Sequence, residues 1–212
     1  GASQDEPLLV NDYANIIANV CGLKIYNNAT TGTLLIQDQQ TRAAYYGVWV
    51  SRKPIAVHAE EQTVAEILQL VRQYRVFTHF CHISTKFEID LLRAAKEEGL
   101  PISIGVTPHH LYLTEADLPV LGSSGLMKPT LKTAADREAL WQAVSDGVVD
   151  IIESDHAPHT LEEKHSATPP YGVPGLETTL SLMCLAVKNR RIDYAQLIDM
   201  IALNPQRIFG IH

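Results

Sequence analysis

Side chains able to bind a metal ion stand at or near the ends of short apolar runs along this sequence. The set comprises Lys24, His58, His82, the pair His109–His110, and Asp155. Imidazole nitrogens and carboxylate oxygens are common zinc ligands, and in a parallel α/β fold the side chains past the carboxyl ends of strands line the ligand site. A single strand-end histidine is more typical of a buried structural residue. Core packing does not explain why several such residues close consecutive strands, so the pattern as a whole predicts a metal site.

Lys24 lies inside an apolar run, residues 21–26, where an unpaired ammonium group would be costly. It therefore needs a carboxylate partner, a neutral form or a covalent change. His79 and His82 lie in another run. Because side chains alternate between the two faces of a strand, residues three apart point to opposite faces, and only one of these histidines is expected to reach the site.

The stretch 151–160 is the most informative part of the chain. An apolar run leads to Asp155 and then to a His-Ala-Pro-His turn, where the proline cannot continue a strand. This places Asp155 at the carboxyl end of a strand, where we expect it to act as a metal ligand and to carry a proton. The proline-containing loop 167–175 that follows is predicted to be a lid or a pocket wall.

The composition is that of a globular protein. Of 212 residues, 46% are hydrophobic and 19% are charged, so we expect a single domain over residues 1–212. No apolar run approaches the ~20 residues of a membrane span, and a net charge of -7 with scattered Lys and Arg argues against a nucleic-acid surface. The three cysteines lack a CxxC spacing and are typical of reduced thiols, which favours a soluble, cytoplasmic protein.

Apolar periodicity and turn residues predict strands that alternate with helices. The strands are expected at 21–26, 54–58, 76–82, 102–107 and 147–154. The helices are expected at 8–20, 37–51, 63–74, 85–98, 114–118, 133–144, 176–188, 194–202 and 205–209. This alternation is typical of an α/β fold with a parallel sheet. Because a closed barrel of this kind has eight strands and about 250 residues, the pattern leaves two alternatives, an incomplete barrel or an open sheet.

The segments GLKIY, VHAEEQT, CHIST, TPHHLYL, SDHAPHTLEEK, GVPGLET and NPQRIFGI follow one another through nearly the whole chain. Together they resemble the dihydroorotases of the amidohydrolase superfamily, in particular the class with the Asp-His-Ala-Pro-His-Thr motif. The resemblance implies a parallel (β/α) barrel of the TIM type, incomplete in this chain, with strands that correspond to the fourth to the eighth. Residues 1–3 resemble the end of that family's third strand.

The resemblance also implies roles for particular residues. Lys24 matches a lysine that reacts with carbon dioxide to form a carbamate bridging two zinc ions, which would resolve its buried charge. His58 and His82 match ligands of the second zinc, which leaves His79 as a structural residue, and Asp155 matches a ligand of the first. His159, with the backbone near Ala157 and Gly172, matches groups that hold the substrate. Lys128 is a further candidate, as a cation for a substrate carboxylate.

The implied reaction is zinc-assisted hydrolysis of a cyclic amide, or its reverse, closure of carbamoyl aspartate to dihydroorotate in pyrimidine biosynthesis. Asp155 would pass a proton to the amide nitrogen. The sequence departs from the family in having no His-x-His pair, which in relatives supplies two ligands of the first zinc. The family's carboxylate-binding Arg and Asn also belong to strands without a counterpart here. We therefore expect partial zinc binding and weak or no catalysis by this chain alone.

Several interpretations remain open from the sequence. The chain is a fragment of a dihydroorotase, a half that needs a complementary barrel half, or a non-catalytic structural subunit. Its expected partners are accordingly the substrate, a second copy, the other barrel half or an aspartate transcarbamoylase. Another cyclic amidase, such as an allantoinase or hydantoinase, is the alternative activity. A small α/β binding protein with incidental histidines is the alternative outside enzymes.

Overall fold

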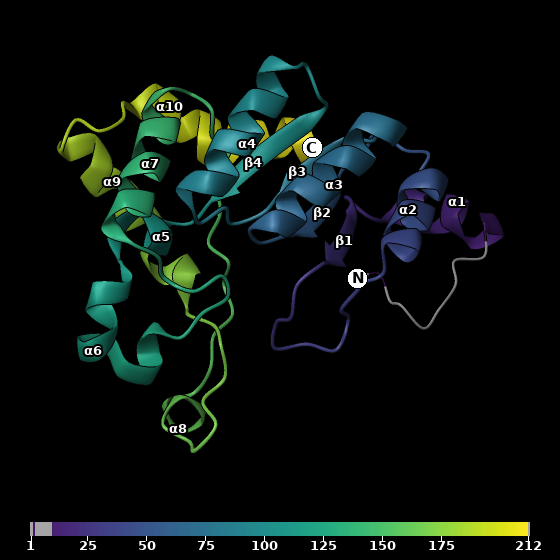
Figure 1. Cartoon of the computed structure of the whole chain (residues 1–212). Coiled ribbons are helices and arrows are strands. Elements are labelled where there is room, and N and C mark those ends of the chain that lie inside the picture. Colours follow the sequence, from purple (N-terminus) through teal and green to yellow (C-terminus); the bar gives the residue numbers. More distant parts are fainter. Residues whose placement is uncertain (1, 3–9, 212) are drawn as a thin grey trace.

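Five short strands form one parallel sheet, in the order β1-β2-β3-β4-β5. This is a computed structural model, and it describes residue 2 and residues 10–211. The strands are β1 (Leu23–Tyr26), β2 (Ile55–His58), β3 (Thr78–Phe80), β4 (Ile102–Val106) and β5 (Ile151–Ile152). Each strand pairs with the next along the chain, as Figure 1 shows for the labelled strands β1 to β4. The parallel α/β fold expected from the sequence is therefore confirmed.

The register of the sheet separates an apolar row from a polar row. Paired residues of parallel strands lie side by side, and successive residues alternate between the faces. The apolar row is Ile25, Val57, Phe80 and Ile104, each fully buried in the core. The neighbouring row is Lys24, Ala56, His79 and Ser103. One face of the sheet thus packs against helices, while the other carries polar groups.

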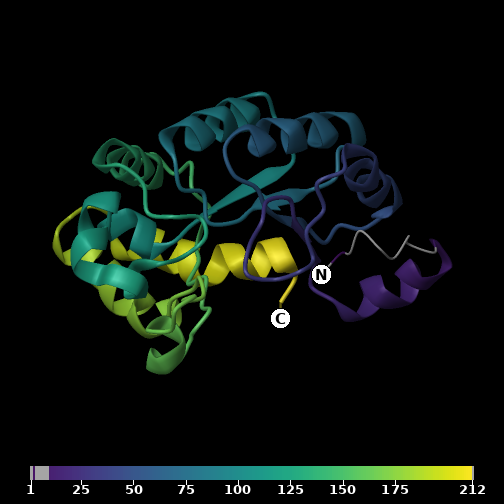
Figure 2. The same cartoon turned by 60° about the horizontal axis from the view of Figure 1, so that its bottom comes forward.

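Helices follow the strands around the apolar face. They are α2 (Gln39–Val48), α3 (Gln62–Tyr74), α4 (Lys86–Glu97) and α7 (Ala134–Ser145), and each contacts the next. On α3 the residues expected to face the core, Val64, Ile67, Leu68 and Val71, are all buried. Figure 2 shows α3 and α4 on one side of the sheet and the C-terminal helical segment on the other. That segment comprises α10 (Tyr194–Ile198), a π-helical turn (Asp199–Leu203) and α11 (Asn204–Phe209).

The remaining elements flank this core. They are α1 (Val10–Asn19), α5 (Pro108–Tyr112), a 3-10 turn (Glu115–Asp117), α6 (Leu118–Leu121), a 3-10 turn (Gly122–Gly125), α8 (Leu161–Lys164) and α9 (Gly175–Lys188). None of the helices within the described ranges is long and apolar enough to cross a bilayer.

The buried carboxylate of Glu88 ties together two loops at the carboxyl end of the sheet. Thr85 and Glu88 form a capping box that starts α4, in which the Thr85 N–H donates to the Glu88 carboxylate at 2.9 Å. The same carboxylate accepts from the backbone N–H of Ser84 at 2.9 Å and of Glu61 at 2.7 Å. Glu61 follows His58 and Ser84 follows His82. The segments beyond β2 and β3 are therefore held to each other by one residue.

Some boundaries differ from those expected. Strand β5 has two residues rather than the expected eight, and two short helices, α5 and α8, lie where loops were expected. Both helices begin at a threonine whose side chain accepts from a backbone N–H inside the helix, Thr107 for α5 and Thr160 for α8. The caps are visible in the sequence, but four or five residues give too little periodicity to predict a helix.

The amino-terminal segment lies only partly within the described residues. Residues 1 and 3, which carry part of the third-strand resemblance, and the start of the helix expected at 8–20 fall outside them. Ala2 is described, and its N–H donates to the Lys24 carbonyl at 2.9 Å. This contact places Ala2 beside β1, on the edge away from β2.

The packing of α4 against the sheet gives a stability prediction. Leu92 is fully buried, so Leu92→Ala removes packed methyl groups and should lower the free energy of unfolding by about 2–5 kcal/mol. Urea unfolding followed by the fluorescence of the buried Trp49 and Trp141 measures this. Val120 is 90% exposed, and Val120→Ala should change stability by no more than about 0.5 kcal/mol. Equal effects of the two substitutions would contradict the assigned core.

Candidate functional site

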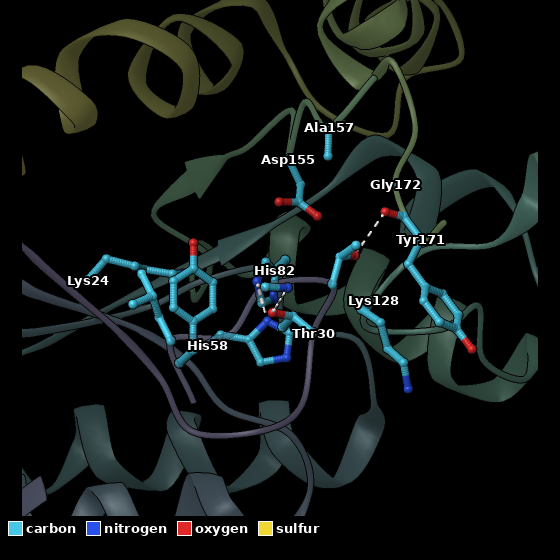
Figure 3. A pocket seen from close by; sticks show the side chains of 13 residues that line it. Lys24, Thr30, His58, His82, Lys128, Asp155, Ala157, Tyr171 and Gly172 are labelled. Carbon is cyan, nitrogen blue, oxygen red and sulfur yellow. Dashed lines mark hydrogen bonds between the residues drawn. The ribbon is translucent and has the colours of Figure 1, made fainter. Parts of the chain in front are cut away.

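A pocket of about 280 Å³ opens at the carboxyl ends of the strands. Its wall includes Lys24, His58, His82, Lys128, Asp155, Ala157 and Gly172, which were all proposed from the sequence. Figure 3 shows Asp155 across from the two imidazoles, with Lys128 and Tyr171 on the other side of the pocket from Lys24. Of the residues proposed from the sequence, His159 and the pair His109–His110 are not part of the wall. The structure thus brings together residues that are far apart in the sequence, from Lys24 to Gly172.

His58 and His82 present ring nitrogens to the same point. The Nδ1 atom of His58 lies 3.0 Å from Nε2 of His82, and both side chains are buried. The other ring nitrogen of His58, Nε2, donates to the Glu60 carboxylate at 2.9 Å. This bond leaves Nδ1 of His58 with its lone pair toward His82. A carboxylate behind an imidazole in this way is typical of metal-binding histidines.

The backbone is strained at two of these residues. His82 has φ 38° and Asp155 has φ 41°, in the left-handed region that non-glycine residues seldom adopt. Each lies just beyond the end of its strand, where the backbone turns away from the sheet. Such strain costs of order 1–3 kcal/mol and is often found at functional sites. The two unfavourable conformations direct both side chains into the pocket.

Lys24 lies beside the thiol of Cys81. Its Nζ atom donates to Sγ at 3.0 Å and lies 5.3 Å from the centre of the Tyr26 ring. Burial lowers the pKa of Lys24, but the Cys81 thiol and the Glu153 carboxylate outweigh this effect and raise it overall. Of the options left open by the sequence, the uncarboxylated side chain is therefore an ammonium paired with acidic neighbours.

The charges around the pocket also act on Asp155 and His82. Burial and the nearby Glu153 carboxylate raise the pKa of Asp155, and the positive charge of Lys24 only partly offsets them. Burial holds the pKa of His82 well below its usual range, with further lowering by Lys24 and His58. His82 is therefore a neutral imidazole at pH 7, the form that binds metals. Its Nδ1 is buried without a hydrogen-bond partner among the described residues.

His79 lies in the polar row of the sheet and does not line the pocket. Its Nδ1 contacts the Ser103 hydroxyl at 2.8 Å, and its Nε2 donates to the Glu153 carboxylate. Burial lowers the pKa of His79, but the Glu153 carboxylate outweighs it, and the pKa rises to about 10. Strand β3 ends at Phe80, so His82 lies beyond the strand, where side chains no longer alternate between the two faces of the sheet. His82 reaches the pocket because the chain turns after the strand.

The loop expected to form a lid or pocket wall does contribute to the wall, through Tyr171 and Gly172. Gly172 has φ 139°, and a Cβ there would lie 2.4 Å from the Ala157 carbonyl oxygen, so only glycine fits. The ammonium group of Lys164 donates to the carbonyls of Leu126, Pro170 and Gly172, each at 3.0 Å. These bonds join the loop to the segment that leads to Lys128.

His159 lies behind this wall rather than in it. Its Nε2 donates to the Tyr171 carbonyl at 3.2 Å, and its Nδ1 lies 3.6 Å from the Glu163 carboxylate. In this arrangement His159 positions a pocket residue.

His109 and His110 belong to α5 and are buried outside the pocket wall. Nδ1 of His110 accepts from the Thr107 hydroxyl at 2.7 Å, and its Nε2 donates to the Pro129 carbonyl at 3.1 Å. His110 therefore supports the segment that carries Lys128.

Sequence reasoning did not assign roles to several residues around the pocket. Glu60 orients His58, Glu153 pairs with His79, and Tyr26, Thr30 and Tyr171 line the wall. Glu60 carried a signal, because it follows a proposed ligand by two residues. Glu153 carried little signal, since a carboxylate two residues before Asp155 is equally typical of a solvent-exposed strand end.

Comparisons with known proteins identify relatives of this chain. No family model matches the chain. The Multifunctional protein CAD of Squalus acanthias is 41% identical over 100% of this chain, which corresponds to 9% of that protein. The Dihydroorotase of Geobacillus thermodenitrificans is 42% identical over 63% of this chain and 32% of its own length. The chain therefore spans about a tenth and about a third of these two relatives.

Solved structures share the fold over about half their length. The L-Hydantoinase (Dihydropyrimidinase) from Arthrobacter aurescens has a TM-score of 0.88 at 19% identity, covering 96% of this chain and 54% of that one. The Inactive dihydroorotase-like domain of the Chaetomium thermophilum CAD-like multifunctional protein has a TM-score of 0.79 at 25% identity, covering 100% and 58%. The strands of this chain thus correspond to part of the (β/α) barrel of the amidohydrolase superfamily.

Within that superfamily, the relatives with 39–42% sequence identity are named dihydroorotase or CAD. The chain is a homologue of the dihydroorotases, as the motifs in its sequence indicated.

The buried histidines of α5 predict how stability changes with pH. Burial lowers the pKa of His109 to about 3 and of His110 to about 4, whereas both would titrate near pH 6.5 in the unfolded chain. Between pH 6.5 and 4 the unfolded state therefore binds more protons, so the free energy of unfolding falls as the pH is lowered. His110 alone should account for a loss on the order of 3 kcal/mol by pH 4.

Urea unfolding at a series of pH values between 7 and 4 measures this loss. The variant His110→Gln should be less stable at pH 7 but should show a shallower pH dependence. His165 is exposed, and His165→Asn should leave the slope unchanged. A His110→Gln slope equal to that of the parent would show that another group causes the acid sensitivity.

Proposed function

We propose that this chain contributes a zinc-binding half-site of dihydroorotase type, which acts on carbamoyl aspartate and dihydroorotate in pyrimidine biosynthesis. The observation that supports it most is the convergence of Lys24, His58, His82 and Asp155 on one pocket. These residues come from four different strands or strand ends. Homology to dihydroorotases supports the same activity.

The residues fit a zinc ion. The ring nitrogens of His58 and His82 are 3.0 Å apart, and two ligands on a tetrahedral zinc with bonds of ~2.0–2.1 Å would lie about 3.3 Å apart. The Glu60 carboxylate orients His58 from behind, as is usual for a zinc-bound imidazole. In the proposed site, a carbamate on Lys24 is the third ligand, and Asp155 supplies a ligand for a second zinc.

Zinc, when bound, would polarise the ring carbonyl and lower the pKa of water. The residues of this chain then hold and move the other groups. Asp155 accepts the proton of the attacking water on its carboxylate and delivers it to the amide nitrogen that leaves the ring. Ala157 and Gly172 hold the ring through their backbone, and His159 fixes Tyr171 beside them. The Lys128 ammonium pairs with the substrate carboxylate.

The donors on this chain are enough for one well-held ion. His58, His82 and the Lys24 carbamate give three ligands, whereas Asp155 and the carbamate give only two for another. Because the sequence has no His-x-His pair, we expect the chain alone to bind about one zinc at this pocket and to turn over substrate weakly if at all. A complementary barrel half would supply the missing donors.

The first test concerns the metal. Protein purified without chelators should lose about one zinc equivalent in the double variant His58→Asn, His82→Asn, as measured by plasma mass spectrometry. Carbon-13 bicarbonate should give a carbamate NMR signal that disappears in Lys24→Met. His165→Asn, which changes an exposed histidine, should alter neither result. A zinc content in the double variant equal to that of the parent, or a carbamate signal retained in Lys24→Met, would refute the proposed ligands.

The second test separates dihydroorotate from the neutral cyclic amides of the hydantoinase alternative. Lys128 is the pocket cation opposite Lys24, and loss of a charged hydrogen bond costs about 1.5–3 kcal/mol. Lys128→Met in the zinc-loaded protein should therefore weaken dihydroorotate binding roughly tenfold or more by calorimetry. Binding of dihydrouracil, the same ring without a carboxylate, should not change.

An exposed lysine gives the matched control. The Lys86 side chain is 60% exposed, and Lys86→Met should leave both affinities unchanged. If Lys128→Met weakens both ligands equally, the pocket does not select for the carboxylate and the hydantoinase-type substrate becomes the better assignment.

A further inference from the structure

A second group of metal-binding side chains lies beside the pocket without lining it. His79, Cys81 and Glu153 each direct one ligand atom inward, and these atoms lie within 4.8 Å of one another. His79 and Cys81 are buried, and the Glu153 side chain is only 18% exposed. The function proposed above uses none of the three.

Neighbouring residues orient the side chains of this cluster. The Ser103 hydroxyl holds Nδ1 of His79 at 2.8 Å, so that Nε2 faces Glu153. Gly105 leaves the space that the Glu153 carboxylate occupies, because a Cβ at Gly105 would lie 1.6 Å from Oε1. The backbone N–H of His82 donates to the other carboxylate oxygen at 3.3 Å. A hydrogen-bonded imidazole and a fixed carboxylate are the supports that a metal site requires.

The ligand atoms of this cluster are of the kinds that bind zinc. One imidazole nitrogen, one thiolate sulfur and one carboxylate oxygen form a three-ligand set that leaves a fourth position for water. They come from β3, from the turn after it and from the end of β5, so the sheet limits their movement. Zinc–ligand bonds are about 2.0–2.3 Å, so the atoms need to close up by about an ångström.

A positive charge already lies against the cluster. The Lys24 ammonium donates to Cys81 Sγ at 3.0 Å. If Lys24 carries the carbamate of the proposed function, that ammonium is replaced by an anion next to Cys81 and Glu153. The carbamate would thus remove a positive charge that disfavours a divalent cation at the cluster.

We propose that His79, Cys81 and Glu153 form a separate binding site for a borderline divalent ion such as Zn²⁺ or Co²⁺. Binding releases the proton of the Cys81 thiol and the proton on Nε2 of His79 to solvent, and the ion takes the place of both. The ion would brace the turn that carries His82 against the end of β5, which leads to Asp155. The site therefore connects two of the residues proposed to hold the pocket zinc.

The chain permits a test in which only one thiol remains. Of its three cysteines, Cys21 and Cys184 are exposed and Cys81 is buried. In the background Cys21→Ser, Cys184→Ser, added Co²⁺ should produce a near-ultraviolet thiolate-to-cobalt charge-transfer band, which ligation by nitrogen and oxygen alone does not give. Cys81→Ser should abolish the band. Glu153→Gln and His79→Gln should each weaken cobalt binding at least tenfold, with circular dichroism confirming that each variant is folded.

Two further variants separate this site from the pocket zinc. His58→Asn, His82→Asn should remove the pocket metal and keep the thiolate band. Lys24→Met leaves all three ligands of the cluster in place, so the thiolate band should persist. Loss of the pocket zinc without loss of the thiolate band would support both proposals. If the pocket binds no zinc while the thiolate band is present, only the proposed function is refuted.

The inference is overturned if the folded background protein shows no thiolate band with excess Co²⁺. It is equally overturned if the band persists in Glu153→Gln and His79→Gln at the affinity of the background. In either case the cluster is an ion pair and a lysine–thiol contact that stabilise the fold without metal.

Discussion

Polar side chains on the inner face of a small parallel sheet are the constraint on which the rest of this structure depends. In-register pairing places Lys24, His79 and Ser103 in one row next to an entirely apolar row. A buried polar group left without a partner costs about 1–3 kcal/mol, so each member of the row must be paired. Ser103 and Glu153 satisfy His79, and Cys81 contacts Lys24. The polar groups on this face of the sheet are therefore paired with one another, and Lys24 among them also lines the pocket.

Beyond the strands, single residues hold the turns that carry the proposed ligands. Glu88 joins the segments after His58 and His82, and Lys164 joins the loop of Gly172 to the segment before Lys128. Both are charged groups that accept or donate several backbone hydrogen bonds at once. Such bonds are stronger than neutral ones and fix the turns at the carboxyl edge of the sheet. The unfavourable φ angles of His82 and Asp155 persist because these surroundings support them.

Solved structures, sequence relatives and the pocket each support a different conclusion about this chain. Hydantoinase structures at 19% identity establish the fold, because they share the arrangement of strands and helices over nearly all of this chain. Relatives named dihydroorotase, at about twice that identity, establish the homology. The positive charge of Lys128 in the pocket favours a substrate with a carboxylate, and it does so independently of either comparison. The fold, the ancestry and the chemistry of the pocket thus support one proposed activity by separate routes.

The sequence alone determined the fold class, the order of the elements and most of the pocket. Apolar runs closed by His58 and Asp155 reveal strand ends, and parallel strands bring their carboxyl ends to one edge whatever the details of packing. Local signals were weaker at β5, where two residues pair instead of eight, and at the short helices α5 and α8. Tertiary structure alone decided which polar groups contact each other. Glu153 reaches His79 only because Gly105, on another strand, has no side chain, and no pattern along the chain records that space. Contacts of this kind depend on distances between strands, which the sequence specifies only through the complete fold.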